Sequence, residues 1–97
     1  ITSLDLKNFD TSNVIDMSSM LGGCTSMKYI NLSNFDTSKV INMSRMFYYS
    51  NVIEELDLSN FETDNLVEVT GMFEMCTSLT KLNISNFKTT KIKYFEF

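Results

Sequence analysis

The side chains able to do chemistry in this chain are carboxylates, amines, hydroxyls and two thiols, because the sequence contains no histidine. Without histidine it lacks the general base of Ser–His–Asp and Cys–His arrangements and the imidazole ligands of many metal sites. A nucleophile could be activated only by a lysine or a carboxylate, and these are spread through the sequence in no convergent order. These residue types predict a protein that is not an enzyme and that binds no metal.

Acidic residues nevertheless recur at one fixed spacing. Asp10, Asp36 and Glu62 are 26 residues apart, and Lys88 takes the next place. A calcium ion takes about six to eight oxygen ligands, and this column of equivalent positions offers one carboxylate per repeat. Aspartate side chains also accept hydrogen bonds from backbone N–H groups two residues on. We therefore predict that the column caps turns and does not hold a cation.

The 26-residue spacing runs through the whole chain. Segments of the form Leu-x-Leu-x-Asn-Phe, with Leu or Ile in the apolar places, start at residues 4, 30, 56 and 82. One such unit cannot bury its apolar face alone, but neighbouring units can cover one another. The sequence therefore predicts a single domain over residues 1–97, a repeat-solenoid fragment of nearly four repeats.

Each repeat predicts the same elements. The alternating apolar and polar residues near 3–6, 29–32, 55–58 and 81–84 favour short strands that pair as one parallel sheet, in register with a 26-residue offset. A Val-x-x-Met stretch predicts a second short strand, and Ser-x-Met-Phe predicts a helical turn. The expected fold class is thus a leucine-rich-repeat-like solenoid of stacked 26-residue coils.

Three columns are expected to support this stack, and one of them is a hydroxyl ladder of Thr11, Thr37, Thr63 and Thr89. The amide of each repeated Asn should donate to backbone carbonyls of one neighbouring coil and accept from N–H groups of the other, and each repeated Phe should join an aromatic spine. These structural residues are Asn8, Asn34, Asn60, Asn86, Phe9, Phe35, Phe61 and Phe87. The side chains expected to be almost fully buried are Phe35, Phe61, Met43, Met46, Phe47 and Met72.

The two cysteines fall in one column. Cys24 and Cys76 are two repeats apart, with Ser50 between them. Two inter-strand steps separate their Cα atoms by roughly 9.5 Å, whereas a disulfide tolerates at most about 7 Å. We therefore predict two free, inward-facing thiols.

A binding function should use positions where the columns vary. The candidates on the solvent face of the strands are Lys28, Tyr29, Asn31, Glu54, Glu55, Asp57 and Lys81. Tyr48 and Tyr49 are further candidates, because the repeat does not require them and exposed tyrosine is a favoured interface residue. The alternatives stay open: the strand face can be a solvated surface whose opposite charges offset each other, and one tyrosine can pack on a neighbouring turn.

The repeat resembles the BspA-like leucine-rich-repeat family of bacterial surface proteins. The resemblance is carried by Ser33-Asn-Phe-Asp-Thr-Ser38, Met43-Ser-Arg-Met-Phe47 and Cys76-Thr-Ser-Leu79. It implies a right-handed solenoid, an extracellular location at a bacterial cell surface, and adhesion to proteins or glycans of host or neighbouring cells. It implies no catalytic residues and no cofactor.

The net charge and the hydropathy of the sequence exclude two classes of partner. The net charge of −4 argues against nucleic-acid binding, and no apolar run reaches about 18 residues, so we expect no membrane insertion by this segment. The first hypothesis is a non-catalytic cell-surface adhesion module. The alternative is a structural array that associates end to end into fibres, and the third is an intracellular interaction scaffold. The chain does not begin with Met, so we expect it to be either a processed product or a piece of a longer protein.

Overall fold

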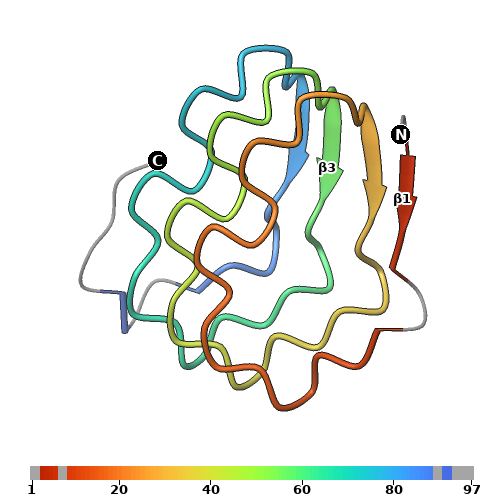
Figure 1. Ribbon diagram of the computed structural model, residues 1–97. Helices are drawn as coiled ribbons and strands as arrows, with labels where there is room; N and C mark the ends of the chain where they lie inside the picture. Colours follow the sequence, from red (N-terminus) through yellow and green to blue (C-terminus); the bar gives the residue numbers. More distant parts are fainter. Residues whose placement is uncertain (1–2, 7–8, 89–90, 93–97) are drawn as a thin grey trace.

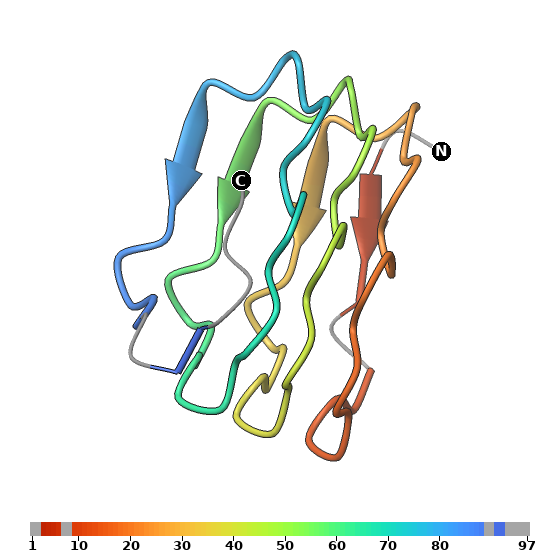
Figure 2. The same ribbon diagram turned by 90° about the vertical axis from the view of Figure 1, so that its left-hand side faces the viewer.

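The computed structural model describes residues 3–6, 9–88 and 91–92. Four strands of three residues each follow one another in the sequence: β1 (Ser3–Asp5), β2 (Tyr29–Asn31), β3 (Glu55–Asp57) and β4 (Lys81–Asn83). The strands lie side by side along one side of the molecule, and a loop of turns leads from each strand to the next (Figures 1 and 2). Successive 26-residue repeats therefore run next to each other.

The pairing of the strands confirms the predicted register. β1 pairs in parallel with β2, with Ser3 opposite Tyr29, and β3 pairs in parallel with β4, with Glu55 opposite Lys81. The prediction of one continuous sheet is wrong, because the ladder is interrupted between β2 and β3 and two two-stranded sheets result. With only three residues in a strand, the loss of few ladder bonds ends the pairing. A backbone bond from the Glu54 N–H to the Lys28 carbonyl (3.2 Å) still joins these repeats.

The predicted second strand is reduced to single bridges, in which Asp16, Asn42 and Glu68 pair in parallel. The stretch after it, residues 44–50 and the equivalents 18–24 and 70–76, is called here the outer turn. The prediction of a helical turn there is wrong. Arg45 and Tyr49 have φ of 56° and 60°, which a right-handed helix does not allow.

The backbone of the outer turn bonds to the next repeat. The N–H groups of Arg45, Phe47 and Tyr49 donate to carbonyls 25 residues further along the chain, at 3.0, 3.0 and 2.9 Å. The outer turns of neighbouring repeats are thus tied together at every second residue. The N–H groups that follow each of these, those of Met46, Tyr48 and Ser50, donate to carbonyls three residues back within the same turn, so only alternate N–H groups bond the next repeat.

Apolar columns fill the interior between the strands and the outer turn. All six side chains predicted to be buried are buried, with exposed fractions of 3% or less. Phe35 and Phe61 stack with their ring centroids 6.4 Å apart. The aromatic spine is wrong at Phe9, which is 56% exposed, because no described repeat lies on its outer side. Phe87 is half-buried.

The asparagine column confirms half of its prediction. The Asn34 amide donates to the carbonyls of Leu6 (2.9 Å) and Phe9 (3.1 Å), and the Asn60 amide donates to those of Leu32 (3.0 Å) and Phe35 (3.1 Å). Within the described residues no backbone N–H donates to these amide oxygens, so the accepting half is not seen. Asn8 lies outside the described residues.

A threonine column ties the repeats together in the opposite direction. The buried hydroxyl of Thr37 donates to the Glu62 carbonyl (2.9 Å) and accepts from the Glu62 N–H (2.7 Å). Thr11 bonds Asp36 in the same two ways, and Thr63 bonds Lys88. Thr89 lies outside the described residues. We call residues 32–40 and their equivalents, which contain both columns, the ladder segment.

Candidate functional site

The polar residues on the strand face contact one another from repeat to repeat. The Tyr29 hydroxyl donates to Oε2 of Glu54 (3.2 Å), and the Lys81 Nζ lies 3.4 Å from Oε1 of Glu55. The hydrogen bond to the Glu54 carboxylate raises the pKa of Tyr29. Both contacts join one repeat to the next, so they favour the alternative in which opposite groups offset each other. Tyr29 is still 52% exposed and is available to a partner.

Two other residues of that face close turns. The backbone N–H groups of Ser33 and Ser59 donate to the side-chain oxygens of Asn31 and Asp57, each at 3.0 Å. The hydrogen bonds from Ser59 hold the pKa of the Asp57 carboxyl below its usual range. These side chains shape the backbone at the ends of β2 and β3, which makes them weaker binding candidates than exposed Lys28.

Two residues of the acidic column, Asp10 and Asp36, cap turns as predicted, whereas no such bond is seen for the Glu62 carboxylate among the described residues. The Ser12 N–H and hydroxyl donate to Asp10 at 3.0 and 2.6 Å, and Ser38 bonds Asp36 at the same two distances. Bonding from these serines lowers the pKa of both carboxyls. Over residues 3–6, 9–88 and 91–92, no group of three or more acidic or cysteine side chains is placed to hold a metal ion.

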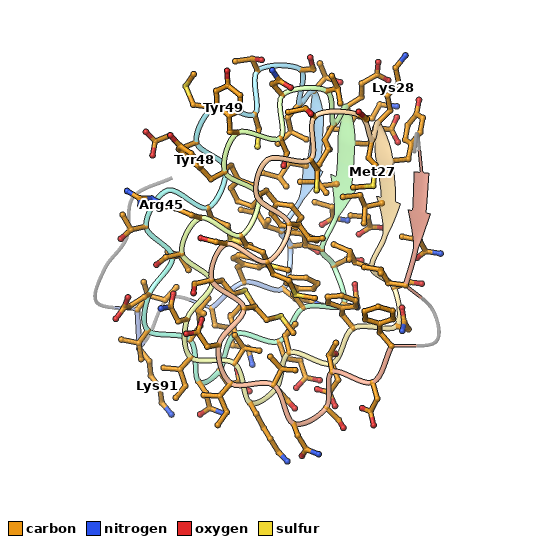
Figure 3. All side chains as sticks on the ribbon, viewed as in Figure 1. Met27, Lys28, Arg45, Tyr48, Tyr49 and Lys91 are labelled. Atoms are coloured by element: carbon orange, nitrogen blue, oxygen red, sulfur yellow. The ribbon has the colours of Figure 1, made fainter. Side chains whose placement is uncertain are left out.

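Tyr48 and Tyr49 form an exposed aromatic pair on the outer turn. Their ring centroids are 6.2 Å apart, and the Arg45 guanidinium carbon lies 5.6 Å from the centroid of the Tyr48 ring. The two tyrosines are 38% and 44% exposed. In Figure 3 they lie, with Arg45, on the side of the coil away from the strands, whereas Lys28 lies beside β2. The structure therefore does not bring the two groups of predicted binding residues together.

The outer turn has left-handed backbone at two positions in every repeat. One position holds Ser19, Arg45 and Gly71 with φ of 58°, 56° and 66°, and the other holds Gly23, Tyr49 and Met75 with φ of 71°, 60° and 65°. Glycine adopts this conformation without steric cost, but bulky side chains rarely do. Tyr49 thus occupies a place that its own column fills with glycine in another repeat.

The two cysteines are free and half-buried, as the column spacing predicts. The Cys76 thiol donates to the Phe47 carbonyl (3.1 Å), and buried Ser50 donates to the Leu21 carbonyl (2.9 Å) from the same column. Burial raises the pKa of both thiols. Both thiols therefore fill space in this column, and the thiol of Cys76 also bonds backbone.

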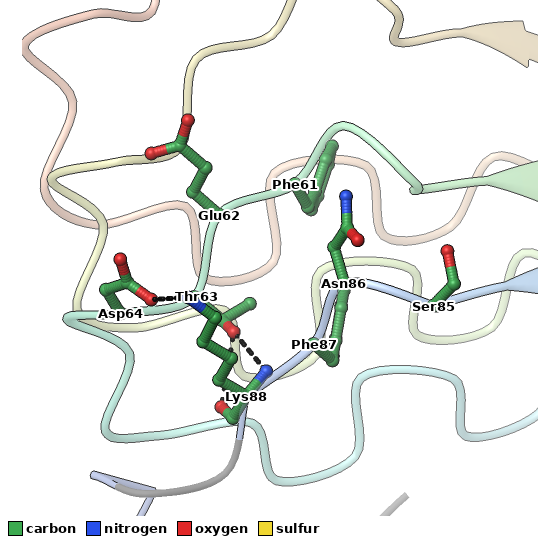
Figure 4. Close-up of a pocket in the computed structure, with 8 residues that line it drawn as sticks. All are labelled: Phe61, Glu62, Thr63, Asp64, Ser85, Asn86, Phe87 and Lys88. Carbon is green, nitrogen blue, oxygen red and sulfur yellow. Dashed lines mark hydrogen bonds and ion pairs between the residues drawn. The ribbon is translucent and has the colours of Figure 1, made fainter.

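A groove lies between the third and fourth repeats (Figure 4). Its lining residues are Phe61, Glu62, Thr63, Asp64, Ser85, Asn86, Phe87 and Lys88. Lys88 pairs with Asp64 at 3.1 Å, and its backbone N–H is held by Thr63. These groups already partner one another, so the groove offers no nucleophile with a base.

An outward-facing apolar column is not among the binding candidates predicted from the sequence. Ile15, Ile41 and Val67 occupy one outward position in three successive repeats, and Ile15 and Ile41 are 56% and 43% exposed. The sequence itself indicates this surface, since an outward position that serves no purpose beyond solubility would not hold an aliphatic side chain in three successive repeats. A structural reason, the preference of β-branched residues for extended backbone, can hide this signal.

The family comparison covers the complete sequence. The family described as "Mycoplasma protein of unknown function, DUF285" matches residues 1–97. No curated protein and no solved structure shows significant similarity to the chain. Among the described residues, no helix is long and apolar enough to cross a membrane.

Proposed function

Because the chain belongs to the DUF285 family, a BspA-like repeat-associated family, we propose that it is a non-catalytic binding module of a bacterial cell surface. The proposed architecture is a leucine-rich-repeat-like solenoid. Its partners are proteins or glycans of host or neighbouring cells, and it acts outside the cell. No cofactor takes part.

The strained, exposed Tyr49 is the observation that carries this proposal. Left-handed backbone costs a non-glycine residue about 1–2 kcal/mol, and Tyr49 bears this cost with 44% of its surface in solvent. Strain of this kind is concentrated at functional sites. A tyrosine pair beside an arginine also has the composition of interface hot spots.

Binding of the fluorescently labelled chain to cultured epithelial cells tests the proposal. Tyr49→Gly removes the ring and relieves the backbone, so the variant should fold at least as well as the parent. We expect its apparent affinity for the cells to fall at least about tenfold, as for a hot-spot tyrosine. Ser19→Gly, which relieves the same conformation without removing a ring, is the matched control and should bind normally.

Pretreatment of the cells separates the two partner classes. Periodate, which cleaves sugar diols, should abolish binding if the partner is a glycan, and protease should abolish it if the partner is a protein. Equal binding of the parent and Tyr49→Gly would contradict the proposal for this surface.

End-to-end self-assembly is the second candidate. It is favoured by Phe9 and Leu82, which are 56% and 39% exposed, whereas their counterparts Phe35 and Leu56 are buried. A further repeat of a longer chain would cover these side chains equally well. Analytical ultracentrifugation over a hundredfold range of concentration distinguishes the two cases, since only self-assembly gives a mass that rises with concentration. An intracellular scaffold would bind neither cell surface nor copy.

A further inference from the structure

Three aliphatic side chains form a ridge on a side of the molecule that the proposed function leaves unused. The Ile41 N–H donates to the Ile15 carbonyl and the Val67 N–H donates to the Ile41 carbonyl, both at 2.8 Å. These bonds hold the three residues at the inter-strand spacing of about 4.8 Å. The ridge is therefore continuous, and its position is set by the backbone.

Two lysines flank this ridge. A groove of about 450 Å³ is lined by Ile15, Lys39, Ile41, Asn65, Val67 and Lys91. Lys39 and Lys91 are equivalent residues two repeats apart, so their backbones are separated by roughly 9.5 Å. Figure 3 shows Lys91 on the lower side of the coil, far from Lys28 and the strands.

These lysines form no ion pair with a described carboxylate, although, besides the hydrogen bonds from Ser38, the charge of Lys39 contributes to lowering the pKa of Asp36. Lys81 and Lys88 form ion pairs with carboxylates of neighbouring repeats. Lys39 instead donates to the neutral amide oxygen of Asn13 (2.9 Å), and neither Lys39 nor Lys91 has an ion pair among the residues that the structure describes. In a chain of net charge −4, this groove is a local positive site with an apolar floor.

We propose that the groove binds an extended acidic segment of a partner protein. Acidic side chains of the segment pair with Lys39 and Lys91, and an apolar side chain between them covers Val67, which lies in the intervening repeat, and the neighbouring Ile41. A polyproline II segment returns to the same face every third residue, about 9.3 Å along its axis, which matches the two-repeat spacing. A β-strand returns after about 6.6 or 13.2 Å and fits less well.

Other ligands match the groove less well. A polyanionic glycan gains nothing from three aliphatic side chains, because sugar rings are bound on aromatic faces and by hydrogen bonds. An anionic membrane would meet two lysines on a molecule of net negative charge, whereas membrane recruitment uses clusters of 4–8 basic residues. The combination of a narrow apolar floor and two spaced cations favours an acidic peptide.

Fluorescence polarisation with two synthetic peptides tests the proposal. The probe is a fluorescein-labelled peptide of four Glu-Val-Pro units, and four Lys-Val-Pro units serve as the charge control. We expect saturable binding of the first peptide alone, weakening as salt rises from about 50 to 500 mM. Equal binding of the two peptides, or no binding of the acidic one, would overturn the proposal.

Variants locate the binding. Ile41→Ser should weaken it about tenfold by removing apolar contact area, and Lys39→Glu should weaken it about fivefold or more. Lys81→Glu changes the net charge equally on the strand face and should bind the peptide like the parent. Since Ile41 and Lys39 are exposed, thermal melts of all three variants should match the parent. If Lys81→Glu weakens binding as much as Lys39→Glu, the groove is not the site.

Parallel titrations with heparin and with phosphatidylserine vesicles complete the test. Binding of either one more tightly than the acidic peptide would overturn the assignment of a protein partner. The inference rests on the proposed binding function but is tested separately from it. The titrations use no cells and depend on Ile41 and Lys39, whereas the cell assay depends on Tyr49, so either can fail alone.

Discussion

The ladder segment and the outer turn both recur every 26 residues and tie neighbouring repeats together in different ways. In the ladder segment, Asn and Thr recur at equivalent positions, and their side chains bond the backbone of a neighbouring repeat. In the outer turn backbone N–H groups make most of these bonds, and Ser50 and Cys76 add side-chain bonds to carbonyls of the preceding repeat. At one left-handed position of this turn the side chain varies from Gly to Tyr to Met. In the ladder segment, side chains thus recur from repeat to repeat where they bond the backbone of a neighbouring repeat. Side chains differ between repeats at the left-handed positions of the outer turn, where the backbone makes these bonds itself.

The largest effect is expected from the ladder segment's aromatic ring. Phe61 is fully buried and stacked on Phe35. Phe61→Ala removes this packing and leaves a cavity, which should lower the free energy of unfolding by about 3–5 kcal/mol. Urea denaturation followed by circular dichroism measures it. A loss below about 1 kcal/mol in a folded variant would show that the ladder segment does not depend on its ring.

A smaller effect is expected from one hydroxyl. Thr37→Val keeps the shape of a side chain that is 1% exposed and removes its two bonds to Glu62. The Glu62 N–H and carbonyl then lose their partner, which should cost about 1–3 kcal/mol. The same measurement applies, and Ser12→Ala, which removes a hydroxyl that bonds only Asp10 within its own turn, is the control. If both variants lose equally little, the threonine column does not hold the repeats together.

A substitution in the outer turn should raise the free energy of unfolding instead of lowering it. Met75→Gly relieves left-handed backbone worth about 1–2 kcal/mol and loses about 0.5–1 kcal/mol through the entropy of glycine. We expect a net gain of up to about 1 kcal/mol. Gly23→Ala, whose new Cβ would meet no atom within 4 Å, should lose a similar amount through strain alone. Thermal denaturation compares both variants, and a destabilised Met75→Gly would mean that side-chain packing outweighs the strain.

The smallest effect concerns acid. Serine bonding lowers the folded-state pKa of Asp10, Asp16, Asp36 and Asp57. A lowered folded-state pKa gives stability that is present above the unfolded value of about 3.9 and is lost as the pH falls through the folded value. Melting temperatures should therefore stay level from about pH 5 to 8 and decline below about pH 4. Asp36→Asn should flatten part of that decline, and an identical profile would refute the role of its charge.

The sequence predicts the register and the interior of this molecule well. The 26-residue spacing identifies equivalent residues, so the parallel offset of β1 and β2 and the burial of Met43 follow directly. The donors in the asparagine column also follow, because an invariant polar residue beside a buried turn needs a backbone partner. These predictions need only the knowledge of which residues occupy equivalent positions, and the 26-residue spacing provides it directly.

The left-handed backbone of the outer turn is harder to predict from the sequence. The apolar spacing of Met43, Met46 and Phe47 suits a helical turn, yet the left-handed Arg45 makes a helix impossible there. Gly71, which occupies the same column, is the residue that indicates left-handed backbone at this position.

The sequence predicts the candidate sites only in part. The spacing shows which residues are exposed on one strand, but it does not show that the tyrosines face away from Lys28.

The two side-chain columns give the row of repeats a polarity, like that of a filament. Each Asn reaches toward the preceding repeat and each Thr toward the following one. The two faces of any repeat are therefore different, and one complements the other. A two-fold axis through equal faces would set donor against donor and leave the carbonyls opposite unpaired. Any copy or further repeat that joins this row must therefore point in the same direction. Such head-to-tail addition does not close on itself, so the row ends only at a repeat that departs from the pattern.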